Sequence, residues 1–329
     1  MEERGLFKFG GLLFIAMLVI AAVAYATGGG RPAAQAAPTA ALGEPRTGAV
    51  PLATAEEPDG AAPADAVCTA DGAPRPLGDE IHESSGAAVS RAHAGIFWTH
   101  NDSSDPLLYA VDAQGRTAGR VRVAGASVED WEDIALAPCP AGGDCLYVAD
   151  IGDNDAERAS VTIYRIPEPA PGASRSAPAT AIRLRYPDGA HDAEAMFVLS
   201  GIVHIVTKGE SGPIALYRAP ANAGGEATLE KIRELSADRV DRPERITGAD
   251  ASADGRWVVL RTLGQAMIYP AAELAGGGTA SPRRVDLGGL EEKQGEGIAF
   301  TPDGSILLTS EGGKKKQAAA FARLTCTLP

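Results

Sequence analysis

One short sequence unit recurs five times along the chain, and it constrains the fold more than any other feature. Each copy has a polar anchor residue, a run of apolar and small residues, a turn and a second apolar run. In the last copy, residues 295–310, the turn is Asp-Gly, which is the strongest short-range signal for a β-hairpin. The anchors lie 47–62 residues apart and are Ser85, Glu132, Glu194, Thr247 and Glu296.

This period predicts a β-propeller. A third strand-like run follows each hairpin, and a fourth follows the first four of them. Four-stranded units that repeat about every 40–60 residues are typical of propeller blades. We therefore predict an all-β, five-bladed propeller, with six blades as the alternative count and a β-sandwich as the competing architecture. The residues at 167–180 are expected to be a loop that lengthens the second unit.

The N-terminal segment indicates export. Residues 10–26 form an uncharged apolar run that follows two basic residues and ends in Ala-Tyr-Ala. Residues 1–26 therefore read as a signal peptide or, uncleaved, as a membrane anchor. Residues 27–64 are rich in Ala, Pro, Gly and Thr, so we expect a disordered linker. Both alternatives place the propeller domain, residues 65–329, outside the cytoplasm, as a secreted, periplasmic or membrane-anchored protein.

The cysteines suggest how the ring closes. The fifth unit lacks a fourth strand, and a strand-like segment at residues 66–70 belongs to no unit. If that segment pairs with the C-terminal strand, it completes the last blade. Cys139 and Cys145 flank one turn, which leaves Cys68 and Cys326 in the two terminal strands. In an exported protein we predict the disulfides Cys139–Cys145 and Cys68–Cys326, with two free buried thiols as the alternative.

Charge and motifs limit the function. The formal net charge is −13, so the chain has no excess of cations with which to neutralise nucleic-acid phosphates. The sequence contains no P-loop, no H-E-x-x-H and no G-x-S-x-G motif, and it gives no nucleotide or haem signal. We expect a monomer that binds a small molecule, a cation or another exported protein.

The repeats also predict where polar side chains gather. The first strand of each blade lines the central channel, and in an antiparallel hairpin the start of the first strand lies beside the end of the second. Side chains at these positions should therefore meet at one mouth of the channel. The predicted ligand-binding set is Glu83, Asp130, Glu132, Glu194, Arg245, Arg261, Glu296 and Glu311.

Carboxylates that converge in this way must bind a cation, pair with basic residues or stay protonated. Ca²⁺ and Mg²⁺ prefer oxygen ligands, so either is a candidate cofactor. The predicted metal ligands are Glu132, Asp150, Asn154, Glu194 and Glu296. Two alternatives stay open: the glutamates pair with Arg245 and Arg261, and the polar residues at 153–155 form a turn.

Four segments carry a family resemblance: D-W-E-D-I-A at 130–135, D-I-G-D-N at 150–154, I-Y-R-I-P-E-P at 163–169 and E-G-I-A-F-T-P-D-G at 296–304. From about residue 65 onward the chain resembles exported bacterial β-propellers of largely uncharacterised function, and more distantly gluconolactonase-like, NHL and WD-repeat propellers. The gluconolactonase-like resemblance implies a divalent metal on the axis, held by Glu, Asn and Asp. Glu296 or Glu132, together with Asn154, would match that pattern.

Two functions follow. The first is an extracytoplasmic binding propeller that holds a divalent cation, or a cationic or polyol ligand, at its acidic mouth. The second is a metal-dependent hydrolase of a lactone, phosphoester or glycoside, in which the metal activates water; a metal-free glycosidase is a variant. The catalytic candidates are His100, Asp192 and Glu296. A lone histidine at a strand end, such as His100, is also commonly structural.

Overall fold

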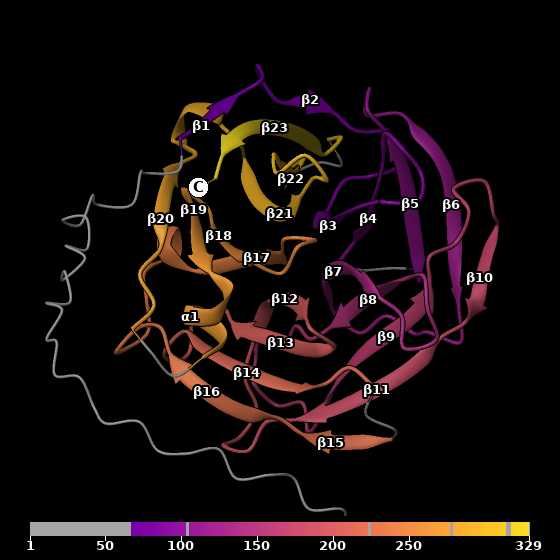
Figure 1. The fold of residues 1–329 in the computed structure, drawn as a ribbon. Coiled ribbons are helices and arrows are strands. Elements are labelled where there is room, and N and C mark those ends of the chain that lie inside the picture. The colour runs from indigo at the N-terminus through magenta and orange to yellow at the C-terminus, as the bar shows by residue number, and fades with distance from the viewer. Residues whose placement is uncertain (1–66, 103–104, 223–224, 277–278, 314–316, 329) are drawn as a thin grey trace, which may run out of the picture. The chain divides into compact units, whose positions relative to one another are not determined.

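The strands form five sheets set around a common axis (Figure 1). The structure is a computed structural model that describes residues 67–102, 105–222, 225–276, 279–313 and 317–328. The predicted leader and linker, residues 1–64, lie outside the described residues. The all-β, five-bladed propeller prediction is confirmed.

Each blade runs outward from an inner strand at the axis. Blade 1 contains β3 (Ser84–Val89), β4 (Ile96–Asn101), β5 (Leu107–Asp112) and β6 (Thr117–Ala124). Blade 2 contains β7 (Trp131–Pro138), β8 (Asp144–Asp150), β9 (Val161–Pro167) and β11 (Thr180–Arg185). Blade 3 contains β12 (Ala193–Leu199), β13 (Ile202–Thr207), β14 (Ala215–Pro220) and β16 (Glu230–Glu234).

The last two blades follow the same order. Blade 4 contains β17 (Ile246–Ala251), β18 (Trp257–Thr262), β19 (Gln265–Pro270) and β20 (Arg283–Asp286). Blade 5 contains β21 (Gln294–Phe300), β22 (Ile306–Glu311) and β23 (Ala320–Thr327), with β1 (Val67–Ala70) and β2 (Arg75–Pro76) beside β23. The helical segments are short: α1 (Ala271–Ala275) and two 3₁₀ turns, Arg242–Glu244 and Gly288–Leu290. In the part of the chain that the structure describes, none is long and apolar enough to cross a membrane.

The N-terminal strand closes the ring, as predicted. Strand β1 pairs antiparallel with β23, and Cys68 lies directly opposite Cys326. These two cysteines form a disulfide across 258 residues of sequence, and Cys139–Cys145 forms the second. Closing so long a loop stabilises the fold by on the order of 5 kcal/mol in the chain-entropy model.

One segment predicted as a loop contains a strand. Residues 167–180 include β10 (Arg175–Pro178), which lies parallel to β6 on the outside of blade 1. The Ser176 hydroxyl accepts a hydrogen bond from the Ala124 N–H. An outermost strand exposes unpaired backbone groups, and a covering segment satisfies some of them. The short sequence Arg-Ser-Ala-Pro has no apolar alternation, so the pattern gave no signal for this strand.

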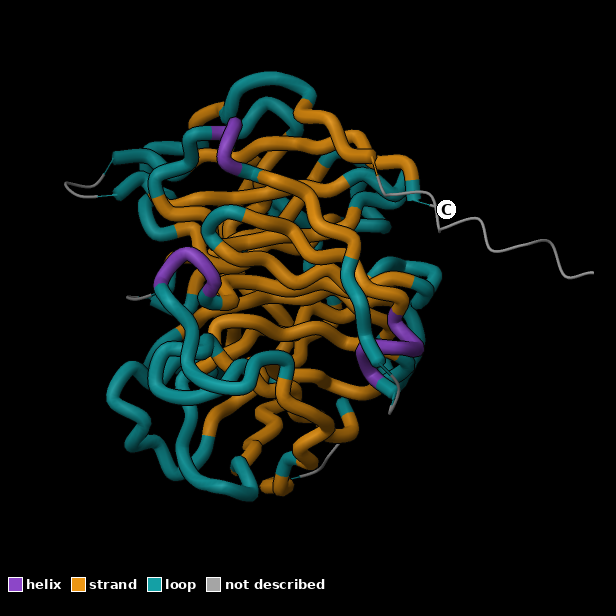
Figure 2. The backbone as a smooth tube through the Cα atoms, turned by 90° about the vertical axis from the view of Figure 1, so that its left-hand side faces the viewer, coloured by secondary structure: helices purple, strands orange, loops and turns teal. Residues whose placement is uncertain are grey.

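The core lies between neighbouring sheets. Inner strands are buried on both faces, as β7 and β12 show, because the next sheet covers each side. For example, Tyr147 and Ile163 of blade 2 share an apolar cluster with Met196 and Tyr217 of blade 3. A view from the side shows the loops at the two ends of the strands, which are the two faces of the ring (Figure 2). The rigid sheets therefore leave the loops and the strand ends to form binding surfaces.

Candidate functional site

Each inner strand has an irregularity in its pairing at the anchor position. In blade 2 Trp131 pairs with Asp150 and Asp133 with Ala149, so Glu132 is an extra residue on its strand. The same break in register includes Glu194 in blade 3. It recurs at Ser85, Thr247 and Glu296 in the other blades. A β-bulge redirects the side chain of its extra residue, and here it does so at the same place in five blades.

The three anchor glutamates are almost fully buried. Their exposed fractions are 8% for Glu132, 9% for Glu194 and 5% for Glu296. Burial raises the pKa of Glu132 and of Glu296 well above the usual range, and the negative charge of Glu194 raises both further. Ser85 Oγ donates a hydrogen bond of 3.1 Å to Glu132 Oε2, which links the anchors of blades 1 and 2.

Lys208 is the basic partner inside this cluster. It follows β13, and its Nζ pairs with Glu194 Oε1 and lies 3.4 Å from Asp192 Oδ2. Burial alone would lower the pKa of Lys208, but Glu194 and Asp192 outweigh it and raise that pKa. Burial raises the pKa of Glu194 to about 7, against the lowering effect of Lys208. Lys208 was not in the predicted ligand-binding set; its place at the end of a second strand predicts that it lies at this mouth, but not that it pairs with Glu194.

The two arginines of the predicted set have other partners. Arg245 Nη1 pairs with Glu210 Oε1 at 2.7 Å. Arg261 is fully buried; its Nη1 donates to the carbonyl oxygens of Gly297 at 2.7 Å and Thr309 at 2.9 Å, and its Nη2 pairs with Glu292. Among the described residues neither arginine forms an ion pair with Glu132, Glu194 or Glu296. The predicted pairing of the glutamates with Arg245 and Arg261 is therefore not found, and Glu194 pairs with Lys208 instead.

An open acidic cavity of about 440 Å³ adjoins the cluster, lined by Glu129, Asp130, Gly152, Asp153, Asn154, Asp155, Glu157 and Arg158. The surroundings of Gly152 show how close this cavity comes to the anchor residues. A Cβ at this glycine would lie 2.4 Å from Asp130 Oδ2 and 2.5 Å from Glu132 Oε1. A side chain at this position would have to displace both carboxylates. Asp130 therefore belongs both to the cavity and to the channel mouth.

Asp150 folds the loop that forms this cavity. Its carboxylate accepts the backbone N–H groups of Glu129 and Asp130, both at 3.1 Å. It also pairs with Arg158 at 2.9 Å. Three partners already use its oxygens, so this predicted metal ligand has a structural task.

Asp153 and Asn154 lie in the same loop, for which the sequence predicts either a metal ligand, Asn154, or a turn. Asp153 accepts the N–H groups of Glu157 and Arg158, both at 2.9 Å, which is the predicted turn interaction. Asn154 is exposed, and its Nδ2 donates to Asp130 Oδ2 at 3.4 Å. Its Oδ1 lies 3.4 Å from Lys208 Nζ. Asn154 therefore links the cavity to the anchor cluster.

The remaining members of the predicted set lie on blades 5 and 1. Gln294 Nε2 donates to Glu311 Oε1 at 3.1 Å. Burial raises the pKa of Glu311 to about 7, and the charges of Asp102 and Glu83 raise it further. Glu83 itself is exposed. The structure thus brings Glu311 and Glu83 to the same mouth as the anchors.

A buried carboxylate that sequence reasoning missed lies directly beside Glu132. Asp133 is fully buried, and its Oδ2 accepts the N–H groups of Met196 at 2.8 Å and Ala249 at 3.2 Å. These partners belong to β12 and β17, so one side chain connects three blades near the axis. The adjacent Glu-Asp pair in the sequence was its only signal. Asp133 therefore holds the inner strands of blades 2, 3 and 4 together next to Glu132.

The predicted catalytic bases are held in place. His100 is fully buried against Trp131, with ring centroids 5.7 Å apart, and burial lowers the pKa of His100 to about 4. This favours the structural alternative for His100. Asp192 Oδ1 accepts the N–H of Asp153 at 2.9 Å, and its other oxygen faces Lys208. Among the three catalytic candidates, only Glu296 combines a place at a bulge with a strongly raised pKa.

The residues present do not fit a metal centre. In the described ranges, no three His, Cys, Asp or Glu side chains are arranged to hold a metal ion. Lys208 occupies the position beside Glu194 that a coordinated metal ion would need. Binding of Ca²⁺ or Mg²⁺ stays a prediction of the sequence, and no step of a mechanism is derived through it.

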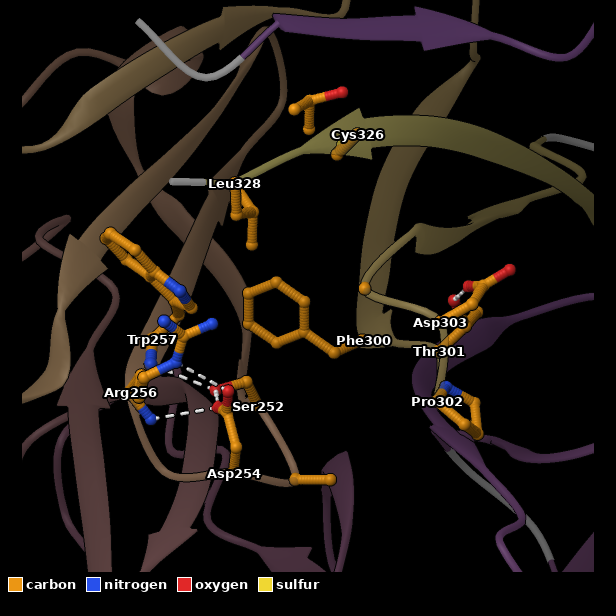
Figure 3. A pocket seen from close by; sticks show the side chains of 13 residues that line it. Ser252, Asp254, Arg256, Trp257, Phe300, Thr301, Pro302, Asp303, Cys326 and Leu328 are labelled. Carbon is orange, nitrogen blue, oxygen red and sulfur yellow. Dashed lines mark hydrogen bonds and ion pairs between the residues drawn. The ribbon is translucent and has the colours of Figure 1, made fainter. Parts of the chain in front are cut away.

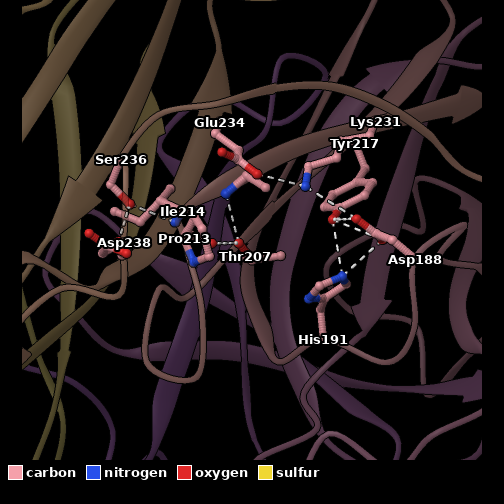
Figure 4. Close-up of polar contacts among 11 residues, drawn as sticks. Asp188, His191, Thr207, Pro213, Ile214, Tyr217, Lys231, Glu234, Ser236 and Asp238 are labelled. Atoms are coloured by element: carbon pink, nitrogen blue, oxygen red, sulfur yellow. Dashed lines mark hydrogen bonds and ion pairs between the residues drawn. The ribbon is translucent and has the colours of Figure 1, made fainter.

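A second polar network lies between blades 2 and 3 (Figure 4). The Tyr217 hydroxyl donates to Asp188 at about 3.0 Å, and His191 Nε2 lies 2.9 Å from the same carboxylate. Lys231 Nζ donates to it at 3.2 Å. These four groups satisfy one another, so the network fastens the segment before β12 to β14 and β16. It gave no sequence signal, because its members are separated by up to 43 residues.

Comparisons with known proteins find distant structural similarities and no sequence relative. A scan of protein-family models finds no match, and a search of curated proteins finds none either. One similar solved structure is a calcium-binding protein, regucalcin, from Agrobacterium tumefaciens, with 14% identity over 77% of this chain and 94% of that chain and a TM-score of 0.45. Another is a soluble aldose sugar dehydrogenase from Escherichia coli, with 9% identity over 79% and 99% and a TM-score of 0.47. A glucose dehydrogenase matches with 13% identity over 78% and 100% and a TM-score of 0.45.

Proposed function

We propose that this protein is an extracytoplasmic binding propeller that takes a cationic ligand at its acidic channel mouth. The observation that carries the proposal is the set of three buried anchor glutamates, Glu132, Glu194 and Glu296, for which Lys208 is the basic partner within the described residues. The extracytoplasmic location rests on the apolar N-terminal sequence and on the two disulfides, which persist in oxidising compartments.

The crowding of carboxyl groups at the mouth provides the driving force for binding a cation. Near neutral pH the cluster keeps some of its carboxyl groups protonated, because burial and neighbouring negative charges raise their pKa values. A bound cation lets these groups ionise and forms charge-assisted hydrogen bonds with them. Binding should therefore release protons, and affinity should rise with pH.

The geometry favours an organic cation over a metal ion. Ca²⁺ requires several oxygens at about 2.3–2.6 Å, and the carboxylates here are not so arranged. An ammonium or guanidinium group bonds to oxygens at about 2.7–2.9 Å, and its donors can reach several carboxylates that stand apart. The adjoining cavity of about 440 Å³ leaves room for the rest of such a ligand.

Calorimetric titration of the full chain at low ionic strength tests this proposal. The probes are 1,5-diaminopentane and, separately, calcium chloride. We expect the diamine to bind with proton release and Glu296→Gln to weaken binding about tenfold, the loss of one charged hydrogen bond. Glu230→Gln is the matched control, because Glu230 pairs with Arg218 on the exposed side of blade 3. Absence of binding by both probes, or an equal effect of the two variants, would contradict the proposal.

A metal-free hydrolase is the second candidate. Carboxyl groups whose pKa lies near 7, as for Glu194 and Glu311, suit general acid catalysis at neutral pH. A panel of chromogenic lactones, phosphoesters and glycosides tests it. Turnover that is lost in Glu296→Gln would favour the hydrolase over the binding protein, and no turnover would remove it.

A further inference from the structure

Among the described residues, two large cavities lie on the face opposite the acidic mouth, where the inner strands end. The first, about 460 Å³, lies between blades 4 and 5 beside Trp257, Phe300 and Leu328 (Figure 3). Its charges are satisfied locally, since Asp254 pairs with Arg256 at 2.7 Å and accepts a hydrogen bond from Ser252 at 2.6 Å. This cavity offers an apolar surface with no free charge to define a ligand.

The second cavity lies between blades 5 and 1 and has a different lining. Its volume is about 470 Å³, within the range of about 300–1,000 Å³ that small-molecule sites occupy. Phe97, Leu307 and Phe321, each exposed by 6% or less, form a buried apolar floor, and the half-buried Val89 and Ile96 form the wall that a ligand can reach. The rings of Phe97 and Phe321 lie 5.6 Å apart, centroid to centroid. We call this cavity the seam groove, because the strands that close the ring border it.

Three arginines and one aspartate are the ionisable residues that line the seam groove. Arg91 is paired with Asp144, at 3.0 Å from its Nε. Arg323 is paired with Asp303 and lies 3.4 Å from Asp71. These two arginines are therefore largely neutralised by their partners.

Arg75 differs from them. It is exposed on β2, and it forms no ion pair within the described part of the chain. Its guanidinium carbon lies 4.5 Å from the centroid of Phe321, in a cation–π contact that holds it over the apolar floor. The seam groove thus combines an apolar floor with one oriented, uncompensated cation.

We propose that the seam groove binds a small amphipathic carboxylate, whose apolar body lies against Val89 and Ile96 and whose carboxylate pairs with Arg75. A guanidinium presents parallel donors that match the two oxygens of a carboxylate. The chain as a whole carries a formal charge of −13, which disfavours anions. The attraction for a carboxylate therefore comes from Arg75 at this site and not from the net charge. This site is separate from the cation site and does not depend on it, since it lies at the opposite strand ends and selects the opposite charge.

A matched series of eight-carbon probes tests the proposal on the full chain: octanoate, octan-1-ol and octylammonium. Binding is measured by calorimetry and by saturation-transfer NMR. We expect octanoate to bind most tightly and octylammonium not to bind at the seam groove. Arg75→Gln should weaken octanoate about three- to tenfold, and Ala94→Glu, which adds a negative charge to an exposed lining residue, should weaken it at least as much.

Arg218→Gln is the control for net charge, because it removes an exposed arginine on blade 3. Arg75→Gln and Arg218→Gln leave the apolar floor intact, and circular dichroism of each variant checks that it folds. Equal binding of all three head groups would overturn the proposal, as would absence of octanoate binding at millimolar concentration. An equal effect of Arg75→Gln and Arg218→Gln would also overturn it, because the effect would then come from net charge alone.

Discussion

The two faces of this propeller are built from opposite ends of the same strands, yet they treat charge in opposite ways. At the mouth, bulges gather glutamates from three blades, and Lys208 neutralises only part of their charge. At the other face, hairpin turns pair their own charges, as Asp254 and Arg256 do two residues apart, and Arg75 of the seam groove, unpaired within the described residues, is an exception. Local pairing needs no ligand, whereas charge gathered from separate blades leaves repulsion that a ligand can relieve.

The largest loss of stability is expected when Lys208, the lysine that pairs with Glu194 at the mouth, is replaced. Lys208→Met leaves Glu194 and Asp192 buried without their partner, and loss of one member of a buried pair costs about 3 kcal/mol or more. The matched change at the other face, Arg323→Met, breaks a more exposed pair and should cost less than about 1 kcal/mol. Urea unfolding at pH 7.5 measures both. Equal losses would erase the distinction between the faces.

The pH dependence of stability should show the same contrast. Folding raises the pKa of Glu194 and of Glu311 to about 7, so the folded protein binds more protons than the unfolded chain between about pH 4.5 and 7. Stability should therefore fall as pH rises through this window, by up to about 3 kcal/mol for each group. Asp250, buried between blades 4 and 5 with its pKa also raised to about 7, acts in the same direction.

Asp254 and Asp303 act in the opposite sense. Hydrogen bonds from Ser252 and Thr301, respectively, lower the pKa of each to about 2, so their contribution is present above about pH 4 and is lost as pH falls toward 2. Thermal unfolding from pH 2 to 8 separates the two windows. A stability that rises from pH 5 to 8 would show that the mouth is fully compensated in the folded protein.

Glu296→Gln should stabilise the protein at pH 7.5 by about 1 kcal/mol or more, because folding raises the pKa of Glu296 well above its usual range and glutamine removes that cost. At pH 5, close to the ordinary pKa of a glutamate, the gain should be much smaller. Guanidinium unfolding at the two pH values checks this. A loss of stability at pH 7.5 would mean that the ionised glutamate has a compensating partner.

The smallest effect is expected for Asp254→Asn. Its pair with Arg256 is half exposed, so the cost should be below about 0.5 kcal/mol. Urea unfolding at pH 7 measures it. A cost as large as that of Lys208→Met would show that ion pairs at the two faces contribute equally to stability, against the proposed contrast.

Sequence reasoning reached the features that repeat. The anchors Glu132, Glu194 and Glu296 recur with the blade period, so their common position followed from the pattern. Cys68 and Cys326 followed from a blade that lacked one strand. The buried pair of Arg261 and Glu292 had no such signal, because Glu292 lies in a loop between blades and has no counterpart in the repeat.

The seam groove was equally beyond the pattern. Arg75, Arg91 and Arg323 come from distant parts of the sequence and meet only because the ring closes between blades 5 and 1. The role of Lys208 was also missed, since a repeat shows which positions converge but not which side chains pair. Only the packed sheets determine those partners.

The bond between Cys68 and Cys326 gives the folded chain unusual mechanics. Both ends of the propeller leave from one blade, on either side of a single covalent link. Tension applied between the two termini is carried by that sulfur–sulfur bond, and the other four blades bear no load. If the leader tethers the protein to a surface, a partner that pulls on the C-terminal segment would stretch the tether while the binding faces keep their shape.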